Sequence, residues 1–175
     1  MLDVQVLAAR QIAALLDASQ KALVAEIAAL GAHAGRRLVP GEWSANEVLG
    51  HLVEAERRGF AGRIRTILAE DRPVLETWDA AVVAAARRDE QRDPEDLIGE
   101  FIDGRDESLA LVRALGPGAL ARVGLHPAIG ELTVRELVHE WVHHDRDHLA
   151  QVLDLTRRLV WSGMGNARRF SERGG

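Results

Sequence analysis

Four histidines lie close together near the end of the chain, in the segment HEWVHHDRDH at residues 139–148. Neutral imidazole is a good ligand for Zn, Ni, Fe and Co ions, so a subset of these side chains could hold a metal. Three imidazoles around one ion would leave a position open for water or substrate, as catalytic sites do. The alternative is that the histidines are partly buried or solvated and satisfied by hydrogen bonds.

The helical period separates these histidines into two pairs. An advance of about 100° per residue gathers apolar side chains into one stripe. Its members are Val134, Leu137, Val138, Trp141, Leu149 and Val152. His144 and His148 are four residues apart and lie along one edge of that stripe, whereas the pair His139 and His143 points roughly to the opposite side. We therefore predict that His144 and His148 face the protein interior.

A third ligand should come from another helix, because two ligands rarely make a stable site. His51 lies at the edge of an apolar stripe formed by Val48, Leu49, Leu52 and Val53. His33 follows the expected end of a helix and His126 falls in an expected loop, so neither has such a setting. We predict that His51, His144 and His148 bind one divalent ion per chain, with Zn, Ni, Fe and Co all suited to imidazole.

Three acidic residues accompany the predicted ligands. Glu56 and Asp145 project into the middle of their apolar stripes, where an unpaired carboxylate is costly. They either accept hydrogen bonds from the ligand imidazoles, pair with arginines, or accept from the indole N–H groups of Trp43 or Trp141. Glu140, one turn before His144, is a candidate general base, and a solvated glutamate is its alternative interpretation.

Long helices are the elements that must position these side chains. The chain has no Tyr and no sustained alternation of apolar and polar residues, whereas helix-forming Ala, Leu, Glu and Arg dominate. Apolar periodicity predicts four long helices, over about residues 3–31, 44–70, 94–115 and 133–160. Ser44–Glu47 and Thr133–Glu136 have the spacing of capping boxes, and Pro94 suits a first helical turn.

These elements predict an all-α fold, a four-helix bundle with a long crossover connection between its second and third helices. That connection covers residues 71–93 and includes a short helix around 80–88. The segment between the third and fourth helices, with His126-Pro127 and Gly130, is predicted to be a loop. The bundle forms one domain over residues 1–160, followed by a mobile tail at 161–175.

Composition argues against several classes of partner. The formal net charge of −5 does not suit phosphate binding, so nucleic acid is not expected as a partner. The chain has no Cys, which removes disulfides, thiolate ligands and a cysteine nucleophile. No apolar stretch is long enough to span a bilayer, and the N-terminus does not resemble a signal peptide. We expect a cytoplasmic protein without membrane association.

Two segments resemble the DinB/YfiT-like superfamily. One begins at Trp43-Ser44 and continues through VLGHLVEAERR, which contains His51; the other is GELTVRELVHEWVHHDRDHLAQV. The resemblance extends over about residues 40–155, and its most specific part is H-x-x-x-H followed by L-A-Q, from His144 to Gln151. It implies a four-helix bundle with a three-histidine divalent-metal site, whose ligands would be His51, His144 and His148. It also implies homodimers in many members, and metal-dependent hydrolysis or S-transfer and isomerisation with low-molecular-weight thiols.

The combined prediction is an enzyme in which a divalent metal activates water or a thiol against a small-molecule substrate that the sequence does not name. It would be a hydrolase or a thiol S-transferase, with a low-molecular-weight thiol among the candidate partners. The alternative is a helical bundle that acts as a binding or stress-response module without catalysis, in which any metal is structural.

The first predicted helix suggests self-association. Its apolar arc covers about half the circumference, which is wider than a helix in a monomeric bundle needs. The arc consists of Leu7, Ile12, Leu15, Leu16, Leu23, Val24, Ile27 and Leu30. A symmetric homodimer would cover this surface, and the 71–93 connection or the tail are alternative covers.

Overall fold

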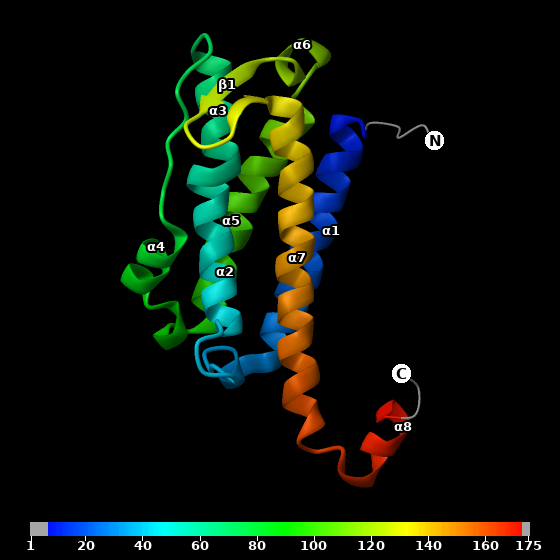
Figure 1. The fold of residues 1–175 in the computed structure, drawn as a ribbon. Coiled ribbons are helices and arrows are strands. Elements are labelled where there is room, and N and C mark those ends of the chain that lie inside the picture. Colours follow the sequence, from blue (N-terminus) through cyan, green and yellow to red (C-terminus); the bar gives the residue numbers. More distant parts are fainter. Residues whose placement is uncertain (1–6, 173–175) are drawn as a thin grey trace.

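The computed structural model describes residues 7–172, which form a bundle of four long helical segments (Figure 1). The segments are α1 (Ala9–Leu30), the continuous run α2 (Ala45–Glu54), η2 (Ala55–Phe60) and α3 (Ala61–Ala69), then α5 (Pro94–Arg113) and α7 (Val134–Trp161). The predicted all-α four-helix bundle is therefore confirmed. No helix within residues 7–172 is long and apolar enough to cross a membrane.

The helix starts that were predicted from capping residues are confirmed. The Glu47 backbone N–H donates to Ser44 Oγ at 3.3 Å, and the Glu47 carboxylate accepts from the Ser44 N–H at 2.9 Å. Thr133 and Glu136 make the same reciprocal pair at the start of α7, at 3.1 and 2.7 Å. These boxes satisfy backbone donors that a helix start otherwise leaves unpaired, and so they fix where each helix begins.

The second long segment contains a π-helical turn, η2, which directly follows α2. The sequence predicts one uninterrupted helix here, with Gly59 and Gly62 as weak points. The wider turn changes the angular phase of the following residues, and such turns occur frequently at functional sites. The altered phase sets the direction of the Phe60 and Arg63 side chains, and both line the cavity described below.

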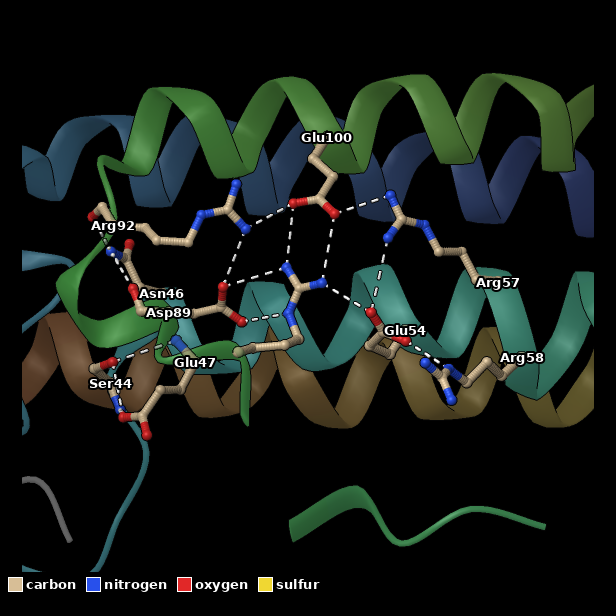
Figure 2. A network of polar contacts seen from close by, with 10 residues as sticks. Ser44, Asn46, Glu47, Glu54, Arg57, Arg58, Asp89, Arg92 and Glu100 are labelled. Carbon is tan, nitrogen blue, oxygen red and sulfur yellow. Dashed lines mark hydrogen bonds and ion pairs between the residues drawn. The ribbon is translucent and has the colours of Figure 1, made fainter. Parts of the chain in front are cut away.

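The crossover connection (residues 71–93) runs back along α2, so that α2–α3 and α5 point in the same direction (Figure 1). It contains the expected short helix, α4 (Ala80–Arg87), and the 3₁₀ turn η3 (Asp89–Gln91). Ion pairs attach it to both neighbouring helices (Figure 2). Arg87 Nη1 bonds to Glu54 Oε1 at 2.8 Å, and Arg92 Nη1 bonds to Glu100 Oε2 at 2.8 Å.

The loop predicted between the third and fourth helices is wrong: the segment holds a short helix and a hairpin. α6 (Pro117–Leu120) is followed by β1 (Val123–His126) and β2 (Gly130–Thr133), paired antiparallel from Val123↔Thr133 to His126↔Gly130. Strands of four residues are too short to show alternation, and this hairpin depends on a tertiary partner. The crossover connection supplies this partner, since Leu75 N donates to Leu125 O at 2.8 Å and Leu125 N donates to Pro73 O at 2.8 Å.

The apolar arc of α1 is covered within the chain, which corrects the reason given for a homodimer. α1 packs against both α5 and α7, so a wide arc has two neighbours to contact. Ile12, Leu16, Leu23 and Ile27 are buried, and the other members of the arc are half-buried. α1 begins at Ala9 rather than at residue 3, and residues 1–6 lie outside the described part of the chain.

The tail is partly helical. After α7 ends at Trp161, the turn η4 (Gly165–Ala167) leads into α8 (Arg168–Glu172), and Arg168 Nε donates to the Trp161 carbonyl at 3.0 Å. None of the residues of η4 or α8 is buried, so this segment adds little to the core.

The bundle has two apolar cores with a polar layer between them. One core contains Leu16, Ile64 and Trp141, and the other contains Leu23, Leu52 and Val152. Between them along the helices lie buried polar side chains, namely Ser19, Gln20, Glu56, Arg105, Ser108 and Asp145. The three predicted metal ligands belong to the same layer, since His51 is near Glu56 in sequence and His144 and His148 flank Asp145.

Candidate metal centre

Three imidazoles from two helices converge in this layer. His51 extends from α2, and His144 and His148 extend from α7 one turn apart. Each offers a nitrogen, and the three nitrogens lie within 4.8 Å of one another. His51 Nε2 is 3.0 Å from His144 Nε2, although the two residues are 93 positions apart in the sequence. The structure thus brings together the three histidines that the sequence singles out.

The donor set fits a divalent ion. Two imidazole nitrogens that each lie about 2.0–2.1 Å from one ion are separated by roughly 3–3.4 Å, close to the distance between His51 and His144. His148 Nδ1 bonds to Gln151 Oε1 at 3.0 Å, which fixes the proton on Nδ1 and leaves the Nε2 lone pair free. Gln151 belongs to the L-A-Q segment, but spacing alone did not identify its contact with His148.

Apart from the contact between their own Nε2 atoms, the other two imidazoles are oriented by aromatic rings. The Nδ1 atoms of His51 and His144 are buried and have no hydrogen-bond partner among the described residues. His51 lies between Trp43 and Trp78, with ring centroids 5.1 and 5.8 Å away. Phe60 meets His144 edge-on at 5.2 Å. These rings restrict imidazole rotation and keep water away from the site.

The half-buried imidazoles of His51 and His144 are neutral near pH 7. Burial lowers the pKa of His51 to about 4, with a contribution from the nearby His148. Burial, followed by His148 and His51, lowers the pKa of His144 to about 3. Only a neutral imidazole has a lone pair for a metal, so these environments keep two of the three donors in the binding form well below neutrality.

Glu56 and Asp145 pair with an arginine, one of the three interpretations that the sequence left open. Arg105 on α5 is fully buried and donates to Asp145 Oδ2 at 2.6 Å and to Asp145 Oδ1 at 3.1 Å. Its Nε donates to Glu56 Oε1 at 2.6 Å, and Nη1 also donates to the Leu16 carbonyl at 3.0 Å. Neither carboxylate hydrogen-bonds to a ligand imidazole within the described structure. The two acids therefore hold η2, α5 and α7 in register and support the site indirectly.

Arg105 was missed by the sequence reasoning, although a signal for it was present. The buried face of α5 consists of Leu97, Phe101, Arg105, Ser108, Leu109 and Val112. Arg105 stands four residues after Phe101 and four before Leu109, in the middle of an apolar stripe. A cation at such a position needs buried acids, and the chain offers Glu56 and Asp145 in equivalent positions on two other helices.

A cavity of about 770 Å³ opens beside the three histidines and shares His144 with them. Its walls come from η2, α3, α7, the hairpin and the crossover connection. Glu140 is exposed on the α7 wall, and the outer histidine pair lies on the same wall. His139 is half-buried with Nδ1 2.7 Å from the Arg135 carbonyl, and His143 is exposed. Neither joins the three-histidine cluster, in agreement with the predicted helical phase.

Comparisons with known proteins agree with this architecture. A family model described as the DinB superfamily matches residues 15–152. Among curated proteins, the chain is 24% identical to "Putative metal-dependent hydrolase YfiT" of Bacillus subtilis (strain 168), over 70% of this chain and 68% of that protein. It is 28% identical to the uncharacterized protein YuaE of the same organism, over 67% of this chain and 80% of YuaE.

Solved structures show the same fold. The structure of YfiT from Bacillus subtilis, described as a probable metal-dependent hydrolase with an unusual four-helix bundle topology, superimposes with a TM-score of 0.78 at 19% identity. The match covers 86% of this chain and 87% of that one. The mycothiol-dependent maleylpyruvate isomerase matches with a TM-score of 0.67 at 11% identity. This second match covers 83% of the present chain but 61% of the isomerase.

Proposed function

Because the chain belongs to the DinB superfamily, we propose that it is an enzyme that requires a divalent metal ion, of the hydrolase or thiol S-transferase type. The observation that carries this proposal is the convergence of His51, His144 and His148, with two Nε2 atoms 3.0 Å apart. The relatives support it, since one is named as a metal-dependent hydrolase and a structural neighbour is a mycothiol-dependent isomerase.

His51, His144 and His148 are the residues that would hold the ion, and Gln151 orients His148. An ion with three imidazole ligands supplies Lewis acidity and lowers the pKa of a water or thiol that it binds. Zn, Ni, Fe and Co all suit this donor set. The protein residues keep the imidazoles neutral, restrict their rotation and exclude water from one side.

The cavity beside His144 is the proposed substrate site. Its volume of about 770 Å³ lies in the range of small-molecule sites. Glu140 lies on its α7 wall and is the proposed general base, because its exposed carboxylate is free to accept a proton from a nucleophile in the cavity. The substrate would be a small molecule, with a low-molecular-weight thiol as the candidate co-substrate.

Metal analysis tests the first step of this proposal. Protein purified without a histidine tag, after growth with metals supplied, should contain close to one divalent ion per chain by inductively coupled plasma spectrometry. His51→Ala, His144→Ala and His148→Ala should each abolish binding, because two ligands rarely retain an ion. His139→Ala and His143→Ala are matched controls on the same helix and should bind as wild type. A metal content below about one tenth per chain, or equal losses in all five variants, would contradict the site.

Activity assays separate the enzyme from a non-catalytic module. Ester, amide and thiol-conjugation substrates should be screened with the metal-loaded protein and again after chelation. Turnover that chelator removes and added metal restores supports the enzyme. Glu140→Gln should then lower kcat by about 10²–10⁴-fold while metal content stays the same, as expected of a general base. Full metal content without turnover would favour the alternative, in which the metal is structural.

We further propose a homodimer, on the basis of the family resemblance alone. Light scattering at micromolar concentration should report a mass near twice the 19.2 kDa chain. The apolar arc of α1 is covered by α5 and α7, so it gives no independent support. A clean monomer would contradict the dimer without affecting the metal centre, since all three ligands come from one chain.

A further inference from the structure

The cavity beside the metal centre is lined by an arginine side chain, and some of its N–H donors have no acceptor among the described residues. Arg63 on α3 lines the cavity together with His144. Its Nη2 donates to the Glu76 carbonyl at 3.1 Å and lies 3.4 Å from His126 Nε2. Its Nε is buried and has no hydrogen-bond partner in the described part of the chain. Only Nη2 has hydrogen-bond partners among the described residues, so the guanidinium has donors left for an acceptor bound in the cavity.

No carboxylate among residues 7–172 forms an ion pair with Arg63, in contrast to three other arginines that are buried or half-buried. Arg87, Arg92 and Arg105 each have at least two acidic partners. Burial lowers the pKa of Arg63, and the negative charge of Glu76 raises it by a smaller amount. The group nevertheless stays charged at neutral pH, because arginine does not lose its proton in proteins. Arg63 therefore lines the cavity with no carboxylate of the described residues paired to it, while Glu136 and Glu140 lie on the α7 wall.

The remaining walls restrict what kind of anion would fit. Phe60, Trp78, Leu132 and Leu137 give the cavity a largely apolar lining, and Ile129 at the hairpin turn is 67% exposed beside it. Glu136 and Glu140 stand on the α7 side. Glu136 is occupied by the Thr133 cap, but its charge and that of Glu140 disfavour a polyanion. A planar guanidinium favours a planar carboxylate, which it binds through two parallel hydrogen bonds.

We propose that this cavity binds a small organic acid with an apolar body, whose carboxylate accepts hydrogen bonds from Arg63. The apolar body contacts Phe60, Trp78 and Leu137, and the far end of the ligand reaches His144 and thereby the metal centre. The last step rests on the proposed function, whereas the carboxylate subsite does not. Arg63 is then a substrate-positioning residue that selects acids over their neutral analogues.

Paired probes that differ only in charge test the subsite. 3-Phenylpropionate and 3-phenylpropionamide have nearly the same size and shape, and both should be titrated by calorimetry into metal-loaded and chelator-treated protein. The acid should bind about tenfold or more tightly than the amide, as a charge-assisted hydrogen bond to a buried donor implies. The chelator-treated sample is needed because a carboxylate can also bind a metal directly. In that sample any preference for the acid must come from the protein side chains.

Variants on α3 locate the charge. Arg63→Gln should reduce the preference to near one, and Arg63→Lys should retain part of it, because lysine keeps the charge but not the planar fork. Arg65→Gln is the matched control: Arg65 is exposed on the same helix, pairs with Glu107, and lies outside the cavity, so the preference should be unchanged. Circular dichroism checks that each variant is folded.

Each outcome bears on the proposal. Equal binding of the acid and the amide to chelator-treated wild type, or no binding of either, overturns it without the need for any variant. A preference that survives in Arg63→Gln overturns the assignment to Arg63. Metal content is measured separately, so a preserved preference without bound metal would leave the subsite standing and remove the proposed function. Full metal content without any preference for the acid would remove the carboxylate subsite and leave the proposed function standing.

Discussion

Asp145 and Glu56 bind the same arginine, but they differ in how much the fold depends on their charge. Asp145 has no exposed surface and accepts two hydrogen bonds from Arg105. Glu56 accepts through Oε1 only, while its Oε2 is buried without a partner, and burial raises the pKa of its carboxyl group. Asp145 is therefore the main counterion of Arg105, and Glu56 tolerates a neutral side chain better.

We predict that Asp145→Ala lowers the free energy of unfolding by about 3–5 kcal/mol, because it leaves a buried arginine without its main partner. Glu56→Gln should cost less than about 1.5 kcal/mol, since the glutamine oxygen still accepts from Arg105. Urea denaturation of the two variants and wild type measures both values. A larger loss for Glu56→Gln than for Asp145→Ala would reverse this assignment.

The depressed pKa values of His51 and His144 predict acid sensitivity in the metal-free protein. Their folded pKa values are about 4 and about 3, against about 6.5 in an unfolded chain. Between these values the unfolded state binds more protons, so stability rises with pH and is lost as pH falls below about 6.5. At pH 5, unfolding should take up close to two protons through this pair.

Urea midpoints of metal-free wild type should therefore decrease as pH is lowered from 7 to 5. Burial raises the pKa of Glu56, which has the opposite effect on stability, but Glu56 is present in both proteins compared below. Glu100 has a pKa lowered to about 2 by Arg87 and Arg92 despite its burial, so its contribution is lost only at much lower pH. The double variant His51→Ala/His144→Ala should show a weaker dependence over the same interval. Equal slopes would mean that these imidazoles are not buried as described.

Residue types and helical spacing were sufficient to find the three converging histidines but not their surroundings. The i, i+4 spacing of His144 and His148 is a local property, and so is the position of His51 at the edge of a stripe. Trp78 and Arg63 reach the site through the crossover connection and through the π-helical turn, respectively. Neither path has a local sequence signature, because each depends on how distant segments pack.

At the scale of elements, the same distinction separates the helices from the hairpin. Capping boxes and Pro94 act within one turn, so the starts of α2, α5 and α7 could be predicted to within one residue. The β1–β2 hairpin instead depends on Leu75, which lies in the crossover connection and bonds to Leu125. Gly130, with φ of 84°, permits the turn, but a glycine before a short apolar run also suits a loop.

Gly50 shows how closely the crossover connection approaches α2. A Cβ atom at this position would stand 1.7 Å from Asp89 Oδ2 and 2.5 Å from Asp89 Cγ. Asp89 cannot move freely, because it is buried and pairs with Arg87 and Arg92 (Figure 2). The network of ion pairs and the glycine thus hold the connection against α2, on which His51 lies one residue later.

We predict that Gly50→Ala destabilises the protein by about 1–3 kcal/mol, as overpacking does, although alanine is the better helix former. Gly99→Ala on α5 is the matched control: nothing lies within 4 Å of its added Cβ, so it should stabilise by up to about 1 kcal/mol. Metal affinity should fall in Gly50→Ala only, because displacement of the connection moves Trp78 away from His51. If both variants were equally stable, the contact with Asp89 would not be rigid.

At the scale of the whole molecule, the helices are held together in the polar layer by specific hydrogen bonds and ion pairs, whereas elsewhere they are held together by buried apolar surface. Arg105 joins α5 to η2 and α7 through its two acids, and it reaches α1 through the Leu16 carbonyl. The three histidines join α2 to α7 in the same layer. Two apolar cores fix how the helices pack above and below, while this layer fixes their rotation and register.

A metal ion in this layer would link helices that are far apart in sequence, so its removal should be felt by the whole fold. A ligand present at about 1,000 times its Kd adds about 4 kcal/mol to the stability of the folded state. For a chain of this size, each kcal/mol corresponds to about 2–4 °C in Tm, so chelation should lower Tm by roughly 8–16 °C. Differential scanning fluorimetry with chelator, followed by readdition of metal, measures the shift and its reversal. His143→Ala should show the same shift as wild type, whereas His144→Ala should melt at one temperature with or without chelator. If the wild-type Tm is unchanged by chelation, in protein confirmed to lose its metal, the ion does not stabilise the contact between α2 and α7.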